Sequence, residues 1–200
     1  TIASIPAIQQ GDVTESRTIL SALLATNPIY TNVILVDING DVIAAGKNHD
    51  KAKYLNFADR KQFKDALNNE GFSSGEFVVG KNTMQPIFPF GMVVMDQDNN
   101  PNWVIIIGVR LDHYIEIFES GSYPENSFIG LCDENGRRLF RHPANPKIKV
   151  GKQIQQNVYE AAISSNKAGS ITALATDGIQ RIIVFEPLRL TDANRPYMYM

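Results

Sequence analysis

The strongest constraint on the fold of this chain is an internal repeat. The segment Asp37-Ile38-Asn39-Gly40 recurs as Asp133-Glu134-Asn135-Gly136, at an offset of 96 residues (133 − 37). Solenoid repeats run only to about 50 residues, so a period near 96 favours two similar small domains in tandem. Five further landmarks follow in the same order: a helical stretch (63–67 and 158–162), a glycine that opens a strand (Gly75 and Gly169), a hairpin (80–82 and 176–178), a long strand (86–95 and 181–190) and a polar turn (96–101 and 191–196).

Each copy of the repeat predicts a strand, a hairpin, a second strand, a loop with a helix, and then three antiparallel strands. Asn-Gly in the first hairpin supplies the positive φ angles that a tight turn needs. One face of such a sheet is buried under its helix and loop, a PAS-like topology. We therefore expect an α+β fold, with an N-terminal helix in residues 1–28, a first PAS-like unit in 29–117 and a second in 118–200.

The N-terminal helix has a defined start and end. Asp12 stands at the N-cap position and Glu15 completes a capping box, while Asn27-Pro28 ends the helix. Residues 1–10 are already apolar on one face, so we interpret them as the tail of a longer upstream helix. The apolar face of the main helix consists of Ile19, Leu20, Leu23 and Leu24.

Composition excludes several classes of protein. With 44% apolar residues the chain has enough apolar surface to offset chain entropy, so it is not intrinsically disordered. The formal net charge of −2 provides no basic field for nucleic acid. The longest apolar run, 103–109, is far shorter than the roughly 20 residues that cross a bilayer. The first residue is Thr and the last residues resemble the opening of a strand, so we expect a piece of a longer protein.

No catalytic, metal or cofactor motif is complete. The stretch Gly75–Asn82 has the glycines and Lys81 of a phosphate-binding loop, but Asn82 replaces the Ser or Thr that would hold Mg²⁺, which favours a hairpin turn. Residues 96–100 resemble the start of a calcium loop without its Gly and bidentate Glu, which favours a solvated turn. The three histidines have no ligand spacing. We therefore expect a non-enzymatic domain with no metal and no cofactor.

The second unit has two features of its own. Cys132 is the single cysteine, lies in an apolar stretch, and is expected to be a buried hydrophobe without a nucleophilic role. Arg137, Arg138 and Arg141 surround the first hairpin of this unit and are expected to form a solvated sheet edge.

The stretch 54–67 mixes aromatic residues with Arg60 at the start of a short helix. In one interpretation Phe63 and its apolar neighbours face the sheet and Arg60 is solvated. In the other, Arg60 faces a cavity between helix and sheet, where a guanidinium can bind a carboxylate through two parallel hydrogen bonds. Spacing alone leaves both open.

At this point the sequence resembles a known family. The segments that carry the resemblance are Val36-Asp37-Ile-Asn-Gly40-Asp-Val, Ala58-Asp59-Arg60-Lys-Gln-Phe63-Lys-Asp-Ala66-Leu67, Pro86-Ile-Phe-Pro-Phe90 and Ile107-Gly108-Val-Arg-Leu-Asp112. Together with the repeat, which spans the whole chain, they look like a double Cache sensor domain. The resemblance implies the extracytoplasmic part of a prokaryotic histidine kinase, chemoreceptor or diguanylate cyclase, held between membrane-spanning helices.

The resemblance also implies a small-molecule ligand in the membrane-distal unit, here the first one. We favour a sensor histidine kinase that forms a homodimer in the intact receptor. The alternative is a structural or dimerisation module without a ligand, in which the apolar face of the N-terminal helix pairs with a second chain.

Residue by residue, Arg60 matches the family's carboxylate-binding Arg and Phe63 its second aromatic, whereas Gln62 stands in place of the first aromatic. Arg110 stands where amino-acid-binding members have an Asp for the ligand ammonium, unless the alignment slips to Asp112. These departures favour an anionic carboxylate over an α-amino acid. The weaker candidates are Tyr54 in the lid loop and Phe77, Phe88 and Lys81 in the pocket wall.

Overall fold

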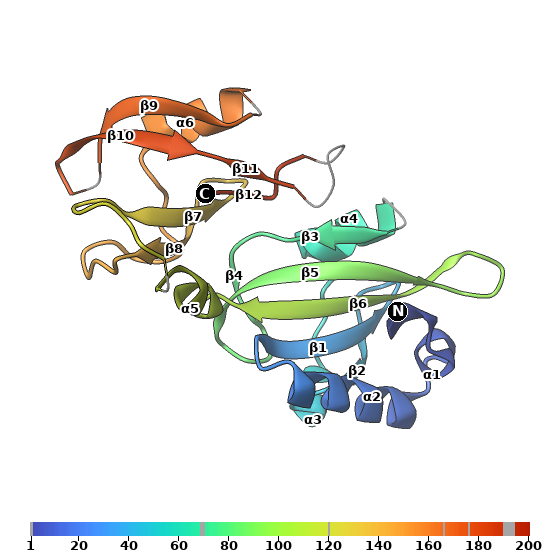
Figure 1. Cartoon of the computed structure of the whole chain (residues 1–200). Coiled ribbons are helices and arrows are strands. Elements are labelled where there is room, and N and C mark those ends of the chain that lie inside the picture. The colour runs from blue at the N-terminus through green and yellow to red at the C-terminus, as the bar shows by residue number, and fades with distance from the viewer. Residues whose placement is uncertain (1, 69–70, 120, 166, 176, 190–194) are drawn as a thin grey trace. The chain divides into compact units, whose positions relative to one another are not determined.

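The computed structural model describes residues 2–68, 71–119, 121–165, 167–175, 177–189 and 195–200. The chain forms two compact units, Thr1–Arg110 and Leu111–Met200 (Figure 1). The N-terminal helices belong to the first unit. The segment 111–117, which we had expected to close the first unit, lies in the second, where Phe118 stacks on Phe140 with ring centroids 5.2 Å apart.

The first unit is a twisted antiparallel sheet with helices on both faces. Its strands run in the order β2-β1-β6-β5-β3, and β4 pairs with the first two residues of β5. The helical elements are a 3₁₀ turn (Ile2–Ser4), α1 (Pro6–Gln10), α2 (Val13–Thr26), α3 (His49–Ala52) and α4 (Lys61–Asn68). The strands are β1 (Tyr30–Asp37), β2 (Val42–Ala45), β3 (Phe72–Ser74), β4 (Val78–Val79), β5 (Pro86–Met95) and β6 (Pro101–Arg110).

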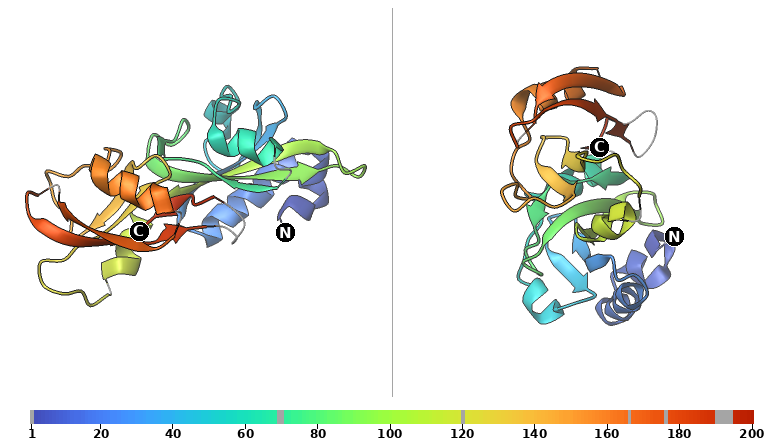
Figure 2. Two further views of the ribbon diagram at one scale, coloured as in Figure 1. Left: turned by 90° about the horizontal axis from the view of Figure 1, so that it is seen from above. Right: turned by 60° about the vertical axis from the view of Figure 1, so that its left-hand side comes forward.

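The core of this unit has one layer on each face of the sheet, and the side chains of β1 point alternately into the two layers. Ile34 and Val36 pack with Phe57, Phe63 and other residues of the side that carries α3 and α4. The intervening Val33 and Leu35 pack on the opposite side, where α1 and α2 lie. Because successive residues of a strand point to opposite faces, β1 connects the two layers directly. The left view of Figure 2 shows α4 on one side of the sheet and the dark-blue N-terminal helices on the other.

The predicted N-terminal helix is confirmed in α2, and its prediction needs two corrections. The Asp12 carboxylate accepts a hydrogen bond from the backbone N–H of Glu15 at 2.8 Å, as an N-cap does, but the backbone N–H of Asp12 donates to the Ala7 carbonyl instead of to Glu15. Residues 2–10 do not continue into α2, because the chain reverses at Gly11 with φ +67°. A Cβ at Gly11 would lie 2.5 Å from the Trp103 ring, so this close approach requires glycine.

The second unit resembles the first in the order of its elements. Its elements are α5 (His113–Glu119), α6 (Gln156–Ser165), β7 (Ile129–Asp133), β8 (Arg138–His142), β9 (Gly169–Leu174), β10 (Gln180–Phe185), β11 (Pro187–Leu188) and β12 (Met198–Tyr199). The sheets have the orders β11-β12-β7-β8 and β10-β9. Glu186 joins β10 to β11 and exchanges two backbone hydrogen bonds with Met200, so the strand order of the first unit recurs. The predicted α+β fold is confirmed.

Most landmarks of the repeat are confirmed, with one error. The turns at Gly40 and Gly136 both have positive φ (86° and 74°), whereas Asn39 and Asn135 do not. Gly169 opens β9 as predicted, but Gly75 opens no strand: it follows β3, and a Cβ there would lie 2.7 Å from both the Gln62 amide and the Pro89 ring. The polar turn predicted at 191–196 lies largely outside the described residues, as does Thr176 of the predicted hairpin.

Candidate ligand pocket in the first unit

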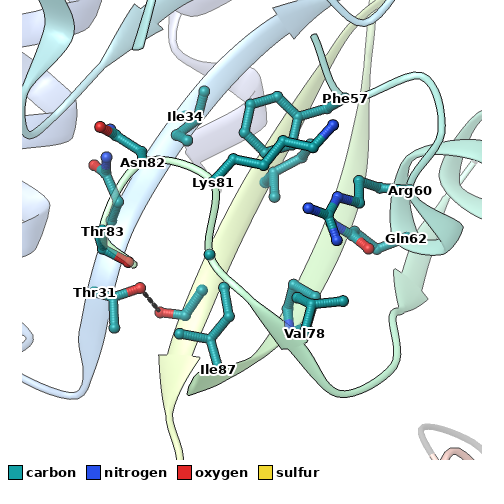
Figure 3. Close-up of a pocket in the computed structure, with 15 residues that line it drawn as sticks. Thr31, Ile34, Phe57, Arg60, Gln62, Val78, Lys81, Asn82, Thr83 and Ile87 are labelled. Carbon is teal, nitrogen blue, oxygen red and sulfur yellow. Dashed lines mark hydrogen bonds between the residues drawn. The ribbon is translucent and has the colours of Figure 1, made fainter. Parts of the chain in front are cut away.

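A small cavity lies between the sheet of the first unit and its loop-helix layer (Figure 3). Its volume is about 30 Å³, enough for one or two water-sized groups. Arg60 and Gln62 lie on one side, Asn82 and Thr83 on the other, and Lys81 between them. The remaining lining residues include Thr31, Asn32, Ile34, Phe57, Val78, Ile87, Pro89, Ile106 and Gly108.

Arg60 is placed by the start of α4. Its backbone carbonyl accepts the first hydrogen bonds of the helix, from the N–H groups of Phe63 and Lys64 at 3.2 and 3.1 Å. The preceding loop is tied to the first hairpin, because the Phe57 N–H donates to the Gly40 carbonyl at 2.8 Å. The Arg60 side chain is 20% exposed and points into the cavity. A guanidinium held in this way presents a planar pair of donors to whatever enters.

Lys81 spans the opening of the cavity from the turn between β4 and β5. Its Nζ donates to the Asp59 carboxylate and to the Asn56 carbonyl, both at 2.7 Å, and lies 5.5 Å from the centroid of the Phe57 ring. The hydrogen bond from Lys81 lowers the pKa of Asp59 below its ordinary value, and the nearby Arg60 lowers it further. Lys81 therefore fastens the hairpin to the loop that precedes α4.

Three buried polar atoms of the lining have no hydrogen-bond partner within the described part of the chain. They are the Oε1 of Gln62, the Oδ1 of Asn82 and the Oγ1 of Thr83. Buried polar groups in proteins are nearly always hydrogen-bonded, so these three atoms are available to bond water or a ligand in the cavity. Gln62 itself is only 2% exposed.

The structure brings together only some of the residues predicted for the site. Arg60 and Gln62 line the cavity. Phe63 is buried in the core under α4, and Phe88 is fully buried and packs edge-on against Phe90 at 5.3 Å. Tyr54 is 80% exposed. Phe77 is half-buried and, like Tyr54, Phe63 and Phe88, is not among the lining residues.

Arg110 lies at the exposed end of β6. It is on the same face as Ile106 and Gly108 but beyond the cavity, and its guanidinium donates to the Pro28 carbonyl at 3.5 Å. Asp112 is exposed and belongs to the second unit, so it does not line the cavity either.

The sequence did not predict that the β4–β5 hairpin supplies polar side chains to the lining of the cavity. Asn82 donates to the Lys47 carbonyl at 2.9 Å, and Asn32 donates to the same carbonyl at 3.0 Å, so the turn is held against the sheet. Gly80-Lys81-Asn82 was recognisable as a turn, but nothing local indicates which side of the sheet a turn folds over.

A scan of family models and a comparison with curated protein sequences found no match. Solved structures do match. The extracellular domain of rpHK1S-Z16, a protein assigned as a histidine kinase, has a TM-score of 0.74 at 15% identity, over 92% of this chain and 74% of that one. The ligand-binding domain of the Pseudomonas aeruginosa amino-acid chemoreceptor PctB, in complex with L-Gln, has a TM-score of 0.66 at 17% identity, over 93% and 72%. The sensor domain of the V. cholerae histidine kinase DctB has a TM-score of 0.58 at 14% identity, over 96% and 81%.

The chain has the fold of a double Cache sensor domain. The resemblance to this family that the sequence indicated is confirmed at the level of the fold. These three structures are an extracellular, a ligand-binding and a sensor domain, respectively. Among the described residues, no three His, Cys, Asp or Glu side chains are grouped to hold a metal ion, and no helix is long and apolar enough to cross a membrane.

Proposed function

We propose that the chain is the extracytoplasmic sensor domain of a membrane signalling receptor and that its first unit binds a small carboxylate. The supporting observation is the cavity that places Arg60 opposite the unpartnered side-chain atoms of Asn82 and Thr83. Arg60 would pair with the carboxylate, and Gln62, Asn82 and Thr83 would hydrogen-bond its remaining polar groups.

Charge favours an anion over an α-amino acid. Arg60 and Lys81 line the cavity and no Asp or Glu does; Asp59 lies outside the lining with its side chain 65% exposed, and its carboxylate is 2.7 Å from the Lys81 Nζ and 3.8 Å from the Arg60 Nε. PctB, which has a similar fold, binds L-Gln and L-Arg. Here the ammonium group of such a ligand would meet two cations. The volume of about 30 Å³ favours the smallest acids, because a longer ligand requires the hairpin at Lys81 to move outward.

The sheet offers a route from the pocket to the N-terminal helices. Thr31 and Asn32 of β1 line the cavity, while Val33 and Leu35 pack against the side that carries α2. A ligand that prefers one position of β1 would bias the position of α2 by its differential affinity, typically about 1–3 kcal/mol. We favour a histidine kinase as the intact receptor, anchored to the membrane by segments outside this chain and acting as a homodimer.

The test is calorimetric titration of the protein with formate, acetate, propionate and glycolate, and with glycine as the amino-acid comparison. We expect saturable binding of at least one acid, and a loss of about ten-fold or more in Arg60→Met, since a hydrogen bond to a charged group contributes about 1.5–3 kcal/mol. Arg110→Met is the matched control and retains affinity. Unchanged affinity in Arg60→Met, with an unchanged circular dichroism spectrum, would refute the assignment.

A structural module is the second candidate, and the small cavity volume is the observation that favours it. Its sequence-based form needs correction, because the apolar face of α2 is not free. Leu20 is fully buried, and Ile19, Leu23 and Leu24 pack on the unit's own sheet. The absence of binding by all four acids would support a module that transmits a signal from another part of the receptor.

A further inference from the structure

The second unit encloses a cavity much larger than that of the first. Its volume is about 400 Å³, within the range of small-molecule sites. The walls are α6 with the segment before it and strands β7, β8, β10 and β12, all within the second unit. Most of the wall is apolar, with Ile154, Val158, Ala162, Ile183 and Phe185 among the lining residues.

A β-bulge turns two arginines of β8 toward this cavity. Gly130 pairs with Arg141 and Leu131 with Phe140, but Cys132 pairs with Arg138, so Leu139 is an extra residue. Residues three apart in a regular strand point to opposite faces, whereas the bulge puts Arg138 and Arg141 on one face. This is the face of Cys132, which packs against Ala162 of α6.

The repeat shows how unusual these two arginines are. The first unit has the same bulge, between Leu35 and Val36, and its residues 96 positions before Arg138 and Arg141 are Val42 and Ala45. Val42 and Ala45 are buried in the apolar core. The second unit therefore places two cations where the same fold elsewhere in the chain places hydrocarbon.

The absence of a side chain at Gly130 adds to the volume of the cavity. Its equivalent in the first unit is Ile34, a buried core residue. A Cβ built on Gly130 meets only the Phe140 carbonyl oxygen, at 3.3 Å, so no side chain fills the space above it. The loss of the isoleucine side chain at this position accounts for part of the added volume.

The charge of Arg138 is not compensated within the described residues. The side chain lines the cavity, the residue is 9% exposed, and no hydrogen bond or ion pair to its guanidinium occurs in that part of the chain. Burial lowers the pKa of Arg138, and the charge of Arg141 lowers it further. An unpaired buried charge is costly, and an anion at this position would remove the cost. The expectation of a solvated edge holds for Arg137, which is exposed, but is wrong for Arg138, which is buried, and for Arg141, whose side chain is only 11% exposed.

The other charges at the cavity are largely balanced. Arg141 and Arg181 share the Asp177 carboxylate at 3.9 and 2.5 Å, and both guanidinium groups lie over the Phe128 ring, 4.6 and 5.6 Å from its centroid. Asp177 is not itself a lining residue; Glu186 is, and it is exposed. Arg138 is thus the group that most needs a counter-ion.

We infer that the second unit holds a second binding site, for a carboxylate with an apolar body. The carboxylate pairs with the fork of Arg138, and the body occupies the apolar wall formed by α6 and β10. Planar bidentate pairing is the geometry that arginine offers to a carboxylate. This site is separate from the cavity at Arg60 and does not depend on a ligand there.

The probes are sodium octanoate and sodium benzoate, with 1-octanol and benzyl alcohol as their neutral counterparts, titrated calorimetrically into the whole 200-residue protein. We expect saturable binding of at least one anion, weaker binding of the matching alcohol, and a loss of about ten-fold or more in Arg138→Met. The exposed neighbour gives the matched control, Arg137→Met, which retains affinity, as does Arg60→Met. Equal affinity of anion and alcohol, equal affinity in Arg138→Met, or no binding of either anion would overturn the inference.

Two further measurements separate a ligand site from a structural role of Arg138. Without ligand, Arg138→Met should melt at a higher temperature than the wild type, because an unpaired charge leaves the interior; a lower melting temperature would assign Arg138 to structure. In the wild type, saturating octanoate should raise the melting temperature, because it binds only the folded state, and Arg138→Met should lose most of this rise. An equal rise in Arg138→Met would place the ligand elsewhere.

Discussion

Three aspartates of this chain hold turns through the same pair of hydrogen bonds. The Oδ1 atoms of Asp37, Asp96 and Asp133 each accept from the backbone N–H groups two and four residues later, at 2.8–3.0 Å. Through these two bonds the Oδ1 of each aspartate closes its own turn. Residues 96–100 form such a turn, and residues 97–100 are exposed, as expected from the sequence.

Glycine in these turns has two separable roles, and a pair of substitutions distinguishes them. Gly40 (φ +86°) and Gly178 (φ +82°) both adopt the left-handed conformation. A Cβ at Gly40 would lie 2.4 Å from the Ala58 backbone nitrogen, whereas a Cβ at Gly178 would have no heavy atom within 4 Å. Gly178→Ala should cost only the backbone strain, about 1–2 kcal/mol. Gly40→Ala should cost more, because the loop that carries Phe57 must also move. Urea unfolding followed by circular dichroism measures both.

Equal losses of unfolding free energy in the two variants would show that the loop before α4 can move to accommodate a methyl group at residue 40 at little cost. The Gly40 variant should also weaken carboxylate binding at Arg60, since the Phe57 N–H that donates to the Gly40 carbonyl positions this loop. The Gly178 variant, in the second unit, serves as the control for that effect.

At the scale of elements, an ion pair helps to fasten the β4–β5 hairpin to the loop before α4. Lys81 reaches from this hairpin to Asp59 and Asn56, and the bond to Lys81 is the main cause of the lowered pKa of Asp59. A carboxyl group with a lower pKa in the folded state stabilises the fold above its unfolded pKa, and this contribution disappears as the pH falls through the folded value. The Lys81–Asp59 ion pair thus stabilises the fold at neutral pH, and this stabilisation is lost as the pH falls below the ordinary Asp pKa of 3.8.

Lys81→Met should accordingly destabilise the first unit at pH 7 and should do so less at pH 3. The loss is modest, because the Asp59 side chain is 65% exposed and solvent screens the pair. Urea unfolding followed by the fluorescence of Trp103, the single tryptophan and a residue of this unit, measures the difference. Lys64→Met, on the exposed side of α4, is the control. A loss independent of pH would mean that Lys81 acts through Asn56 and the Phe57 ring alone.

Local signals predicted the elements whose boundaries depend on local chemistry. Asp12 and Pro28 delimit α2, and the Asp37–Gly40 turn sets the first hairpin, because a cap or a turn is determined by a few adjacent residues. The bulge that buries Arg138 has no such signature, since it depends on pairing between strands. The same limit applies to the pocket: Arg60 was recognisable from its motif, while Asn82 and Thr83 reach it only through the fold of the hairpin.

At the scale of the whole molecule, one topology occurs twice with differently filled interiors. The first unit fills the space between helix and sheet with residues such as Ile34 and Val42 and leaves a cavity of about 30 Å³ beside Arg60. The second unit has Gly130 and Arg138 at the equivalent positions and leaves about 400 Å³. The same backbone topology therefore accommodates packed apolar side chains in one unit and an open cavity with a buried arginine in the other.

This divergence predicts a crossed pattern of ligand binding. A small acid such as acetate should lose affinity in Arg60→Met and keep it in Arg138→Met, while octanoate should show the reverse, because each arginine lines a cavity of a different unit. Calorimetry of each ligand against the protein already saturated with the other measures whether the sites are separate. Independent sites give unchanged affinities in both orders, and a coupling free energy would alter both by the same factor, since binding linkage is reciprocal. Competition of acetate and octanoate for a single site, with one arginine controlling both, would contradict the assignment of two sites.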